Sequence, residues 1–136
     1  MRTAVLLLIS ILLLSACRKS KHEIKSATQL LTQKPWLLSL AGFDDNNNGV
    51  VDASENTVSE CQAGNIYTFN IAGTGTIEDT GTVCQPPASS TFTWQLQGSV
   101  LSLSLQPSAV LQLDETTLSI SPDLPLETRF IMVYKH

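Results

Sequence analysis

Histidine is the side chain that this sequence most clearly lacks. Its two histidines are His22, near the N-terminus, and His136, the last residue. A serine nucleophile needs a base held beside it, so the body of the chain offers no Ser-His-acid arrangement. The carboxylate pairs are neighbours in sequence, and such side chains point apart in turns: Asp44 with Asp45, Glu78 with Asp79, and Asp114 with Glu115. No glycine-rich phosphate loop follows a strand and opens a helix. We therefore predict no enzymatic activity and no catalytic residues.

The body of the chain also has little positive charge. From Pro35 onward it contains two bases, Arg129 and Lys135, against eleven acids. Nucleic-acid binding needs a basic face that neutralises phosphates, so this balance excludes a nucleic-acid partner. Residues 18–34 are different, because they contain five bases and one acid. This basic stretch is either a solvated tether or a segment that an anionic membrane surface attracts.

Long hydrophobic runs are absent except at the N-terminus. After Arg2, residues 4–14 are almost entirely apolar, which is typical of a secretory signal and too short for a spanning helix of about 20 residues. The end of this segment, "LSAC", resembles the lipobox of bacterial lipoproteins. The resemblance implies that residues 1–16 are a signal peptide and that Cys17 becomes the lipidated first residue of the mature chain. Residues 17–27 are then a basic tether to the membrane. Arginine rather than aspartate after the cysteine favours the outer membrane, by the same resemblance.

Cysteine is scarce as well, with three in the chain. If Cys17 is lipidated, Cys61 and Cys84 are left as an even pair in an oxidising compartment, and we expect them to form a disulfide. In the chain-entropy model such a bridge stabilises the fold by about 3 kcal/mol. Two free thiols are one alternative. A metal pair is the other, although no histidine lies near.

Short strands make up most of the remaining sequence. Ser26 can cap a short helix that carries Leu30 and Leu31, and Pro35 ends it. After it, apolar residues alternate with polar ones at period two, the spacing of a β-strand. The alternation places three sets of apolar residues on common faces: Trp36, Leu38 and Leu40; Phe92, Trp94 and Leu96; and Leu101, Leu103 and Leu105. The last segment, "TRFIMVYKH", is continuously apolar at its centre, as expected of a strand covered on both faces.

Eight strands with short connections predict an all-β domain. Short connections join antiparallel neighbours, and no long crossover segment is present for a parallel sheet. We predict an eight-stranded antiparallel up-and-down barrel with a short N-terminal helix, because closure removes exposed sheet edges. A β-sandwich is the alternative. Residues 54–61 are expected to form one or two helical turns.

Several motifs, in order along the chain, resemble the lipocalin-like domains of small bacterial lipoproteins. They are the lead-in "LLTQKPW", the cysteine strand "CQAGNIYTF", the glycine hairpin "GTIEDTGTVC" and the tryptophan strand "TFTWQL". The likeness covers residues 28–136 and implies a small barrel that holds an apolar ligand. Two positions depart from the pattern: Lys34 stands where lipocalins tend to have glycine, and Gly64 stands where an acid is expected.

The stretch "DDNNNGVVDASE", residues 44–55, has the spacing of an EF-hand calcium loop. Calcium takes six to eight oxygen ligands, which that loop supplies from positions 1, 3, 5, 7, 9 and 12, with glycine at position 6. Gly49 occupies position 6, and the backbone carbonyl of Val50 serves position 7. The remaining ligand positions carry side-chain oxygens: Asp44, Asn46, Asn48, Asp52 and Glu55. We predict a structural calcium site, and a plain polar loop is the alternative.

Together these features predict a lipid-anchored, non-enzymatic lipoprotein of the cell envelope, on the periplasmic or surface face of the outer membrane. Its lipocalin-like barrel is expected to bind a small apolar ligand, with calcium ordering the loop. The alternative is a structural or protein-interaction module of an envelope assembly, with a filled barrel. A pocket of about 300 Å³ or more at one barrel end would favour the ligand.

Overall fold

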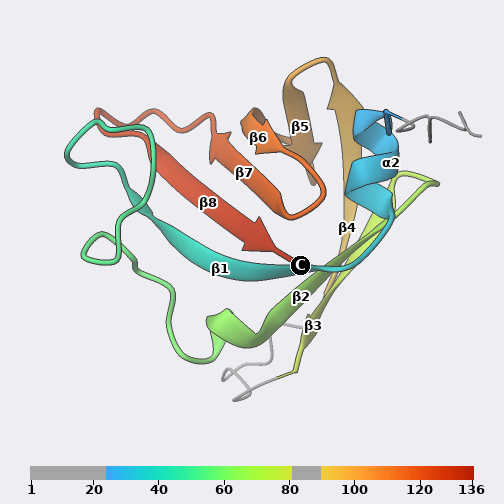
Figure 1. The fold of residues 1–136 in the computed structure, drawn as a ribbon, viewed down its shortest axis with the longest axis horizontal. Helices are drawn as coiled ribbons and strands as arrows, with labels where there is room; N and C mark the ends of the chain where they lie inside the picture. The colour runs from blue at the N-terminus through green and yellow to red at the C-terminus, as the bar shows by residue number, and fades with distance from the viewer. Residues whose placement is uncertain (1–23, 81–89) are drawn as a thin grey trace, which may run out of the picture.

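The computed structural model of the chain describes residues 24–80 and 90–136. The predicted signal peptide, Cys17 and Cys84 lie outside these residues. Within the described residues, one α-helix, one 3-10 helix and eight strands follow in order (Figure 1): α2 Ala27–Thr32, β1 Trp36–Phe43, η2 Gln62–Gly64, β2 Asn65–Asn70, β3 Thr74–Asp79, β4 Ser90–Gln97, β5 Val100–Leu103, β6 Gln106–Leu113, β7 Thr117–Pro122 and β8 Phe130–Lys135. Among the described residues, no helix is both long and apolar enough to cross a bilayer.

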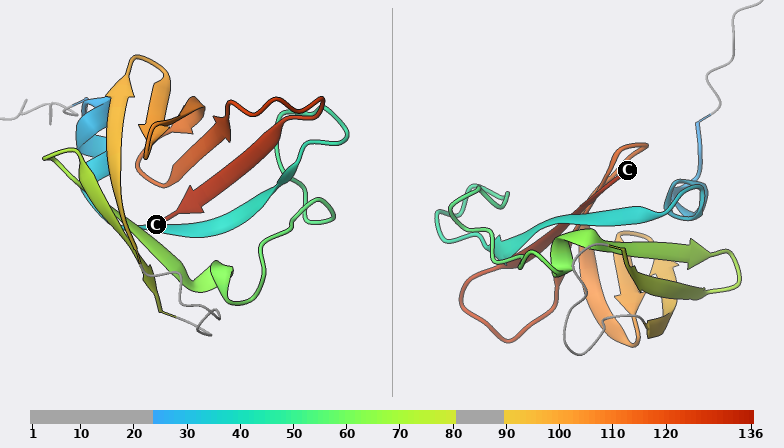
Figure 2. Two further views of the ribbon diagram at one scale, coloured as in Figure 1. Left: turned by 180° about the vertical axis from the view of Figure 1, so that it is seen from behind. Right: turned by 90° about the horizontal axis from the view of Figure 1, so that it is seen from below.

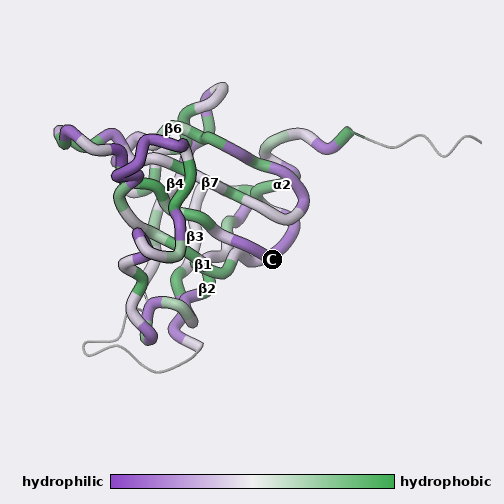
Figure 3. The backbone as a smooth tube through the Cα atoms, turned by 60° about the vertical axis from the view of Figure 1, so that its left-hand side comes forward, coloured by the Kyte–Doolittle hydropathy of each residue, from purple (hydrophilic) through white to green (hydrophobic). Residues whose placement is uncertain are grey.

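The strands form one closed barrel. Each strand pairs antiparallel with the next in sequence, and β8 returns to pair with β1 from Leu37–Lys135 to Phe43–Phe130. The predicted up-and-down barrel is confirmed, and the sandwich alternative is excluded. Closure leaves no open sheet edge on which another chain could add a strand. Figure 3 shows hydrophobic and hydrophilic residues alternating along the strands, as period-two patterning requires.

The predicted N-terminal helix is also confirmed. The Ser26 side chain accepts the N–H of Gln29, and the Gln29 side chain accepts the N–H of Ser26, so the two residues form a capping box. Leu31, on this helix, is fully buried in the core. The indole N–H of Trp36 donates to the Leu31 carbonyl across 2.9 Å. The helix therefore covers the barrel end where β1 begins.

The core fills the barrel interior with side chains. Nine buried residues form it: Leu31, Trp36, Leu38, Phe69, Phe92, Leu101, Leu118, Ile120 and Tyr134. The predicted inward sides of β1, β4 and β5 are thus confirmed at Trp36, Phe92 and Leu101. On β8, Ile131 and Tyr134 are both buried although they stand three positions apart and so point to opposite faces, which agrees with a strand covered on both faces.

Three details of the strand prediction are wrong. A bulge between Leu38 and Leu40 changes the register of β1 against β8, so Leu40 pairs beside Val133 and faces away from Leu38. β5 ends at Leu103, so Leu105 leaves the predicted inward series and lies exposed in the turn. Residues 54–61 do not form helical turns, because Asn56 bridges to Gly42 and the Thr57 N–H donates to the Ala41 carbonyl.

Candidate functional site at the open end of the barrel

One end of the barrel is closed by the helix and the C-terminus. His136 stacks on Trp36, with ring centroids 3.8 Å apart, and its Nδ1 lies 2.7 Å from the Pro35 carbonyl oxygen. In an up-and-down barrel, the β1–β2 and β7–β8 connections emerge at the opposite end, which we call the open end. Figure 2 shows the β1–β2 connection and α2 at opposite sides of the molecule.

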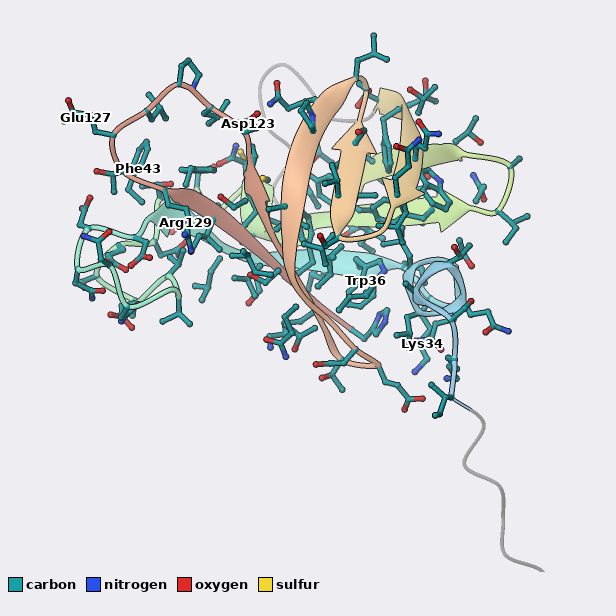
Figure 4. All side chains as sticks on the ribbon, turned by 90° about the horizontal axis from the view of Figure 1, so that it is seen from above. Lys34, Trp36, Phe43, Asp123, Glu127 and Arg129 are labelled. Atoms are coloured by element: carbon teal, nitrogen blue, oxygen red, sulfur yellow. The ribbon has the colours of Figure 1, made fainter. Side chains whose placement is uncertain are left out.

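A hollow of about 390 Å³ lies beside the β7–β8 connection. None of the nine core residues lines it. Its walls come from the starts of β5 and β6, the end of β7 and the connection itself: Val100, Pro107, Ser108, Ala109, Ser121, Pro122, Asp123, Leu124, Leu126, Thr128, Arg129 and Phe130. We call this hollow the rim pocket. Figure 4 shows Asp123, Glu127, Arg129 and Phe43 gathered at this end, away from Lys34 and Trp36.

The rim pocket is mostly apolar. Val100, Leu124 and Leu126 are exposed, with Leu126 at 51%, and Phe130 packs edge-on against Phe43 with centroids 5.1 Å apart. Asp123 and Arg129 are its two charged lining residues. An apolar wall with a few polar groups is the usual composition of a small-molecule site. The arrangement can hold an apolar body and orient one polar group.

The walls of the rim pocket are held by main-chain bonds. The Asp123 N–H donates to the Pro107 carbonyl across 2.9 Å, and the Gln106 side chain donates to the Asp123 carbonyl across 2.8 Å. The β7–β8 connection is thus attached to β6 at one side. Sequence reasoning missed this pocket. The sequence signal for the pocket is the pair of leucines Leu124 and Leu126. They stand beside Pro122 and Pro125, outside any alternating strand pattern.

The predicted calcium loop lies next to the rim pocket. Its first residue, Asp44, is 2% exposed, and its N–H donates to the Arg129 carbonyl across 2.9 Å. The Asp44 carboxylate accepts the N–H groups of Asn48 and Gly49, each at 2.9 Å. Gly49 has φ +85°, the left-handed conformation that glycine adopts without strain and that the sharp turn at position 6 needs.

Several predicted ligand residues come together in the loop. The side-chain amides of Asn46 and Asn48 both donate to Asp52 Oδ2, at 2.8 and 3.1 Å. The Glu55 carboxylate is engaged by the main chain of the loop, because it accepts the N–H groups of Asp45, Asn46 and Asp52. Within residues 24–80 and 90–136, no three acids, histidines or cysteines converge as a ready metal site.

The donor types and spacing of the loop therefore fit calcium, and the arrangement of its side chains fits only in part. Asn46 and Asn48 point their nitrogens at Asp52, and their oxygens accept backbone N–H groups at Asn48 and Val50. Calcium binding would require both amides to rotate so that their oxygens turn toward Asp52. In the described geometry, internal hydrogen bonds order the loop.

The loop also packs on the outer surface of β1. A side chain added at Gly42 would meet the backbone of Glu55 and the side chain of Val51, which is itself buried. Ala41 donates its N–H to the Asn56 side chain. The polar loop is consequently part of the barrel wall at the open end.

The tyrosines of the barrel interior have perturbed pKa values. Burial raises the pKa of Tyr67 above its usual value, and the charge of Asp79 adds to the effect. Burial also raises the pKa of Tyr134, which lies edge-on to Tyr67 with centroids 5.0 Å apart. The Tyr134 hydroxyl donates to Met132 Sδ across 3.6 Å. Both side chains stay neutral in the folded barrel and serve packing.

Of the predicted disulfide pair, Cys61 lies just before η2, with its Sγ 3.4 Å from Ser59 Oγ. Its predicted partner lies outside the described residues, so the pairing stays a prediction. Aromatic residues form core contacts, as predicted from their strand positions. The exceptions are Phe43, which is 37% exposed, and Phe130, which lines the rim pocket.

A closed eight-stranded antiparallel barrel with a short helix at one end defines the class of small up-and-down barrels. A family profile described as a lipocalin-like domain matches residues 39–123, which is more than half of the chain. The chain belongs to this lipocalin-like domain family. No curated protein gives a significant match to it.

Proposed function

We propose that this protein is a lipid-anchored, non-enzymatic component of the cell envelope that binds a small apolar molecule in the rim pocket. The pocket carries the proposal, because about 390 Å³ falls within the range of roughly 300 to 1,000 Å³ typical of ligand sites. Its exposed leucines gain apolar burial when a ligand covers them, at about 25 cal/mol per Å². The family supports the same role, since a lipocalin-like barrel suits small hydrophobic ligands.

A fluorescence titration tests the ligand. The probe is N-phenyl-1-naphthylamine, a neutral apolar dye that brightens when it leaves water. We expect the mature chain to bind it, and we expect Leu126→Asp to weaken binding at least tenfold. The matched control is Leu105→Asp, an exposed leucine in another turn. Equal binding by both variants, or no binding by the wild-type chain, would reject the rim pocket as the ligand site.

Lipid anchoring at Cys17 supplies the location. The described chain begins at residue 24, next to α2, so an anchor before it would hold the closed end toward the membrane and leave the rim pocket facing away. The basic residues between the anchor and α2 would strengthen attachment to anionic lipid. Intact-mass measurement of protein from its own source tests this, since a free N-terminal Cys17 or an uncleaved chain would contradict it.

We further propose that the loop of residues 44–55 binds calcium as a structural ion. The spacing of its oxygen donors and the convergence of Asn46, Asn48 and Asp52 support the site. We expect millimolar calcium to raise the melting temperature of the wild-type chain and leave that of Asp52→Asn unchanged. Asp45→Asn is the control, because Asp45 lies between ligand positions. A wild-type melting curve that calcium and chelator leave alike would refute the site.

The proposed disulfide between Cys61 and Cys84 would join the start of β2 to the β3–β4 connection. Non-reducing peptide mapping tests it, with the linked peptide as the expected result.

The filled interior favours a second function, a protein-interaction module without a ligand. Native mass spectrometry of the protein purified from its own source separates the two functions. A bound small molecule supports the first function. A ligand-free chain that copurifies with an envelope protein supports the second.

A further inference from the structure

The outer wall of β4, β5 and β6 carries no charge. Residues 80–113 contain no acidic or basic side chain, although the whole chain has a net charge of -4. Because Phe92 and Leu101 point inward, their neighbours in the strands point outward. The described outward residues of this neutral wall are hydroxyl, amide and small apolar groups: Thr91, Thr93, Gln95, Gln97, Val100, Ser102, Pro107 and Ala109. Figure 1 shows these strands away from the β1–β2 connection.

Leu105 is the most exposed leucine of the neutral wall, where Leu111 on β6 is 40% exposed. Leu105, in the turn between β5 and β6, is 92% exposed. Its φ is +74°, and that of Ser104 is +47°. This region is costly for residues other than glycine, and a γ-branched side chain with no packing partner within its own barrel gains nothing there. Ser104 and Leu105 are the two central residues of a hairpin in which Leu103 pairs with Gln106, and positive φ at both positions is the geometry of such a turn. The turn thus fixes the direction of the leucine side chain.

A hollow of about 380 Å³ lies on the same wall, beside Leu105. Two bonds to β4 bring its sides together: the Trp94 N–H donates to the Gly73 carbonyl, and the Ser104 N–H donates to the Thr93 carbonyl, each across 2.8 Å. The lining contains no charged residue: Ala72, Gly73, Thr93, Trp94, Gln95, Ser102 and Leu105. A projecting leucine and a neutral hollow therefore stand next to one another.

We propose that the neutral wall docks against the same wall of a second copy of this chain, with Leu105 of each copy in the hollow of the other. A twofold contact uses the same patch on both partners, so a projection and a hollow side by side are self-complementary. Charge selects the partner. Copies of an acidic chain repel wherever carboxylates meet, and this wall is free of them. Burying hydroxyl and amide groups that pair across the contact also avoids the large cost of burying charges.

The neutral wall shares Val100, Pro107 and Ala109 with the lining of the rim pocket, but the contact at Leu105 does not depend on calcium, ligand or lipid. A twofold axis along the membrane normal would leave both N-termini on the same side, which is compatible with two anchored copies. The inference therefore stands or falls independently of the proposed ligand.

Sedimentation equilibrium of the mature chain tests the contact, with Cys17→Ser to prevent cross-linking through that thiol. We expect the wild-type wall to give a dimer at micromolar to high micromolar concentration. Leu105→Asp should weaken dimerisation at least tenfold. Leu126→Asp, in the rim pocket, is the matched control and should leave it unchanged.

A charge-pair experiment keeps the test specific. Gln95→Lys, on the wall of the hollow, should also give monomers, because it places a charged group against the Leu105 side chain of the other copy. An equimolar mixture of Leu105→Asp and Gln95→Lys should restore a dimer that high salt weakens. A wild-type chain that stays monomeric at several hundred micromolar overturns the proposal. So does equal dimerisation by Leu105→Asp and the control, or binding of the wall to phospholipid vesicles in place of a second copy.

Discussion

The backbone N–H of Asp44 donates to the carbonyl oxygen of Arg129 across 2.9 Å. This bond joins the first residue of the polar loop to a residue that lines the rim pocket. Beside it, Phe43 packs edge-on against Phe130. The loop proposed to hold calcium and the connection proposed to hold ligand thus share one end of the barrel wall.

Asp44 stabilises this end even without calcium. We expect Asp44→Ala to lower the free energy of unfolding by about 1 to 3 kcal/mol in chelator, because the N–H groups of Asn48 and Gly49 lose a buried acceptor. Urea denaturation measures the loss. Asp45→Ala is the control and should change stability by less than about 0.5 kcal/mol. If the two variants match, the carboxylate of Asp44 does not order the loop.

Gly42 allows the loop to lie against β1. Gly42→Ala should destabilise the barrel by about 1 to 3 kcal/mol, because its methyl group would overlap the Glu55 carbonyl and press on Val51. Thermal unfolding with and without calcium reports the change. At Gly98, no other atom lies within 4 Å of an added methyl group. Gly98→Ala should therefore cost only the strain of its positive φ, about 1 kcal/mol. If Gly98→Ala lowered stability more than Gly42→Ala, the packing of the polar loop of residues 44–55 against Gly42 would be contradicted.

The two tyrosines of the chain should ionise only when the barrel unfolds. The pKa values of Tyr67 and Tyr134 are raised in the folded state, so their contribution to stability is complete below the unfolded value of about 10. It is lost as pH rises through the folded values. We expect tyrosinate absorbance at 295 nm to appear together with loss of the circular dichroism signal. A reversible rise in absorbance near pH 10 in a fully folded barrel would show that one ring is accessible to water.

Leu105 should lower the folding stability of the isolated, monomeric chain. We expect Leu105→Gly to raise the free energy of unfolding by about 0.5 to 1 kcal/mol, because glycine adopts positive φ without strain and the leucine buries almost nothing. Chemical denaturation should be measured where the wild-type chain is monomeric. Leu103→Gly, which removes a side chain packed on the core, should have the opposite effect. A loss of stability at both positions would mean that Leu105 contributes contacts to its own barrel.

The strands of this barrel follow from its sequence because each has one face in the core. Alternation at Phe92 and Leu101 identifies the inward side, and short connections then leave antiparallel neighbours as the simple arrangement. Ser26 and Gln29 identify the start of α2 for a similar local reason, since the capping box needs only residues three apart. These features depend on neighbours in sequence, and the sequence contains them.

The errors arise where distant contacts decide the conformation. The bulge before Leu40 depends on its pairing with β8, far along the chain. Asn56 and Thr57 extend because Ala41 offers them hydrogen bonds, although their own propensities allow a helix. No sequence periodicity marks the residues of the rim pocket, because they come from a loop and three strand ends that meet only in the closed barrel. The calcium motif, in contrast, is visible in the sequence through its spacing. The directions of its side chains cannot be read from the sequence.

Both ends of the described chain leave the barrel at the pole capped by α2. His136 stacks on Trp36 there, and its N–H donates to the Thr116 carbonyl. A reporter fused after His136 would therefore lie between the barrel and the surface to which the N-terminal tether attaches. It would also disturb the stacking of His136 on the Trp36 indole, which covers the interior at this end. At the opposite pole lie the described β1–β2 and β7–β8 connections. A tag inserted there, or a partner arriving there, meets loops alone and leaves the sealed pole intact.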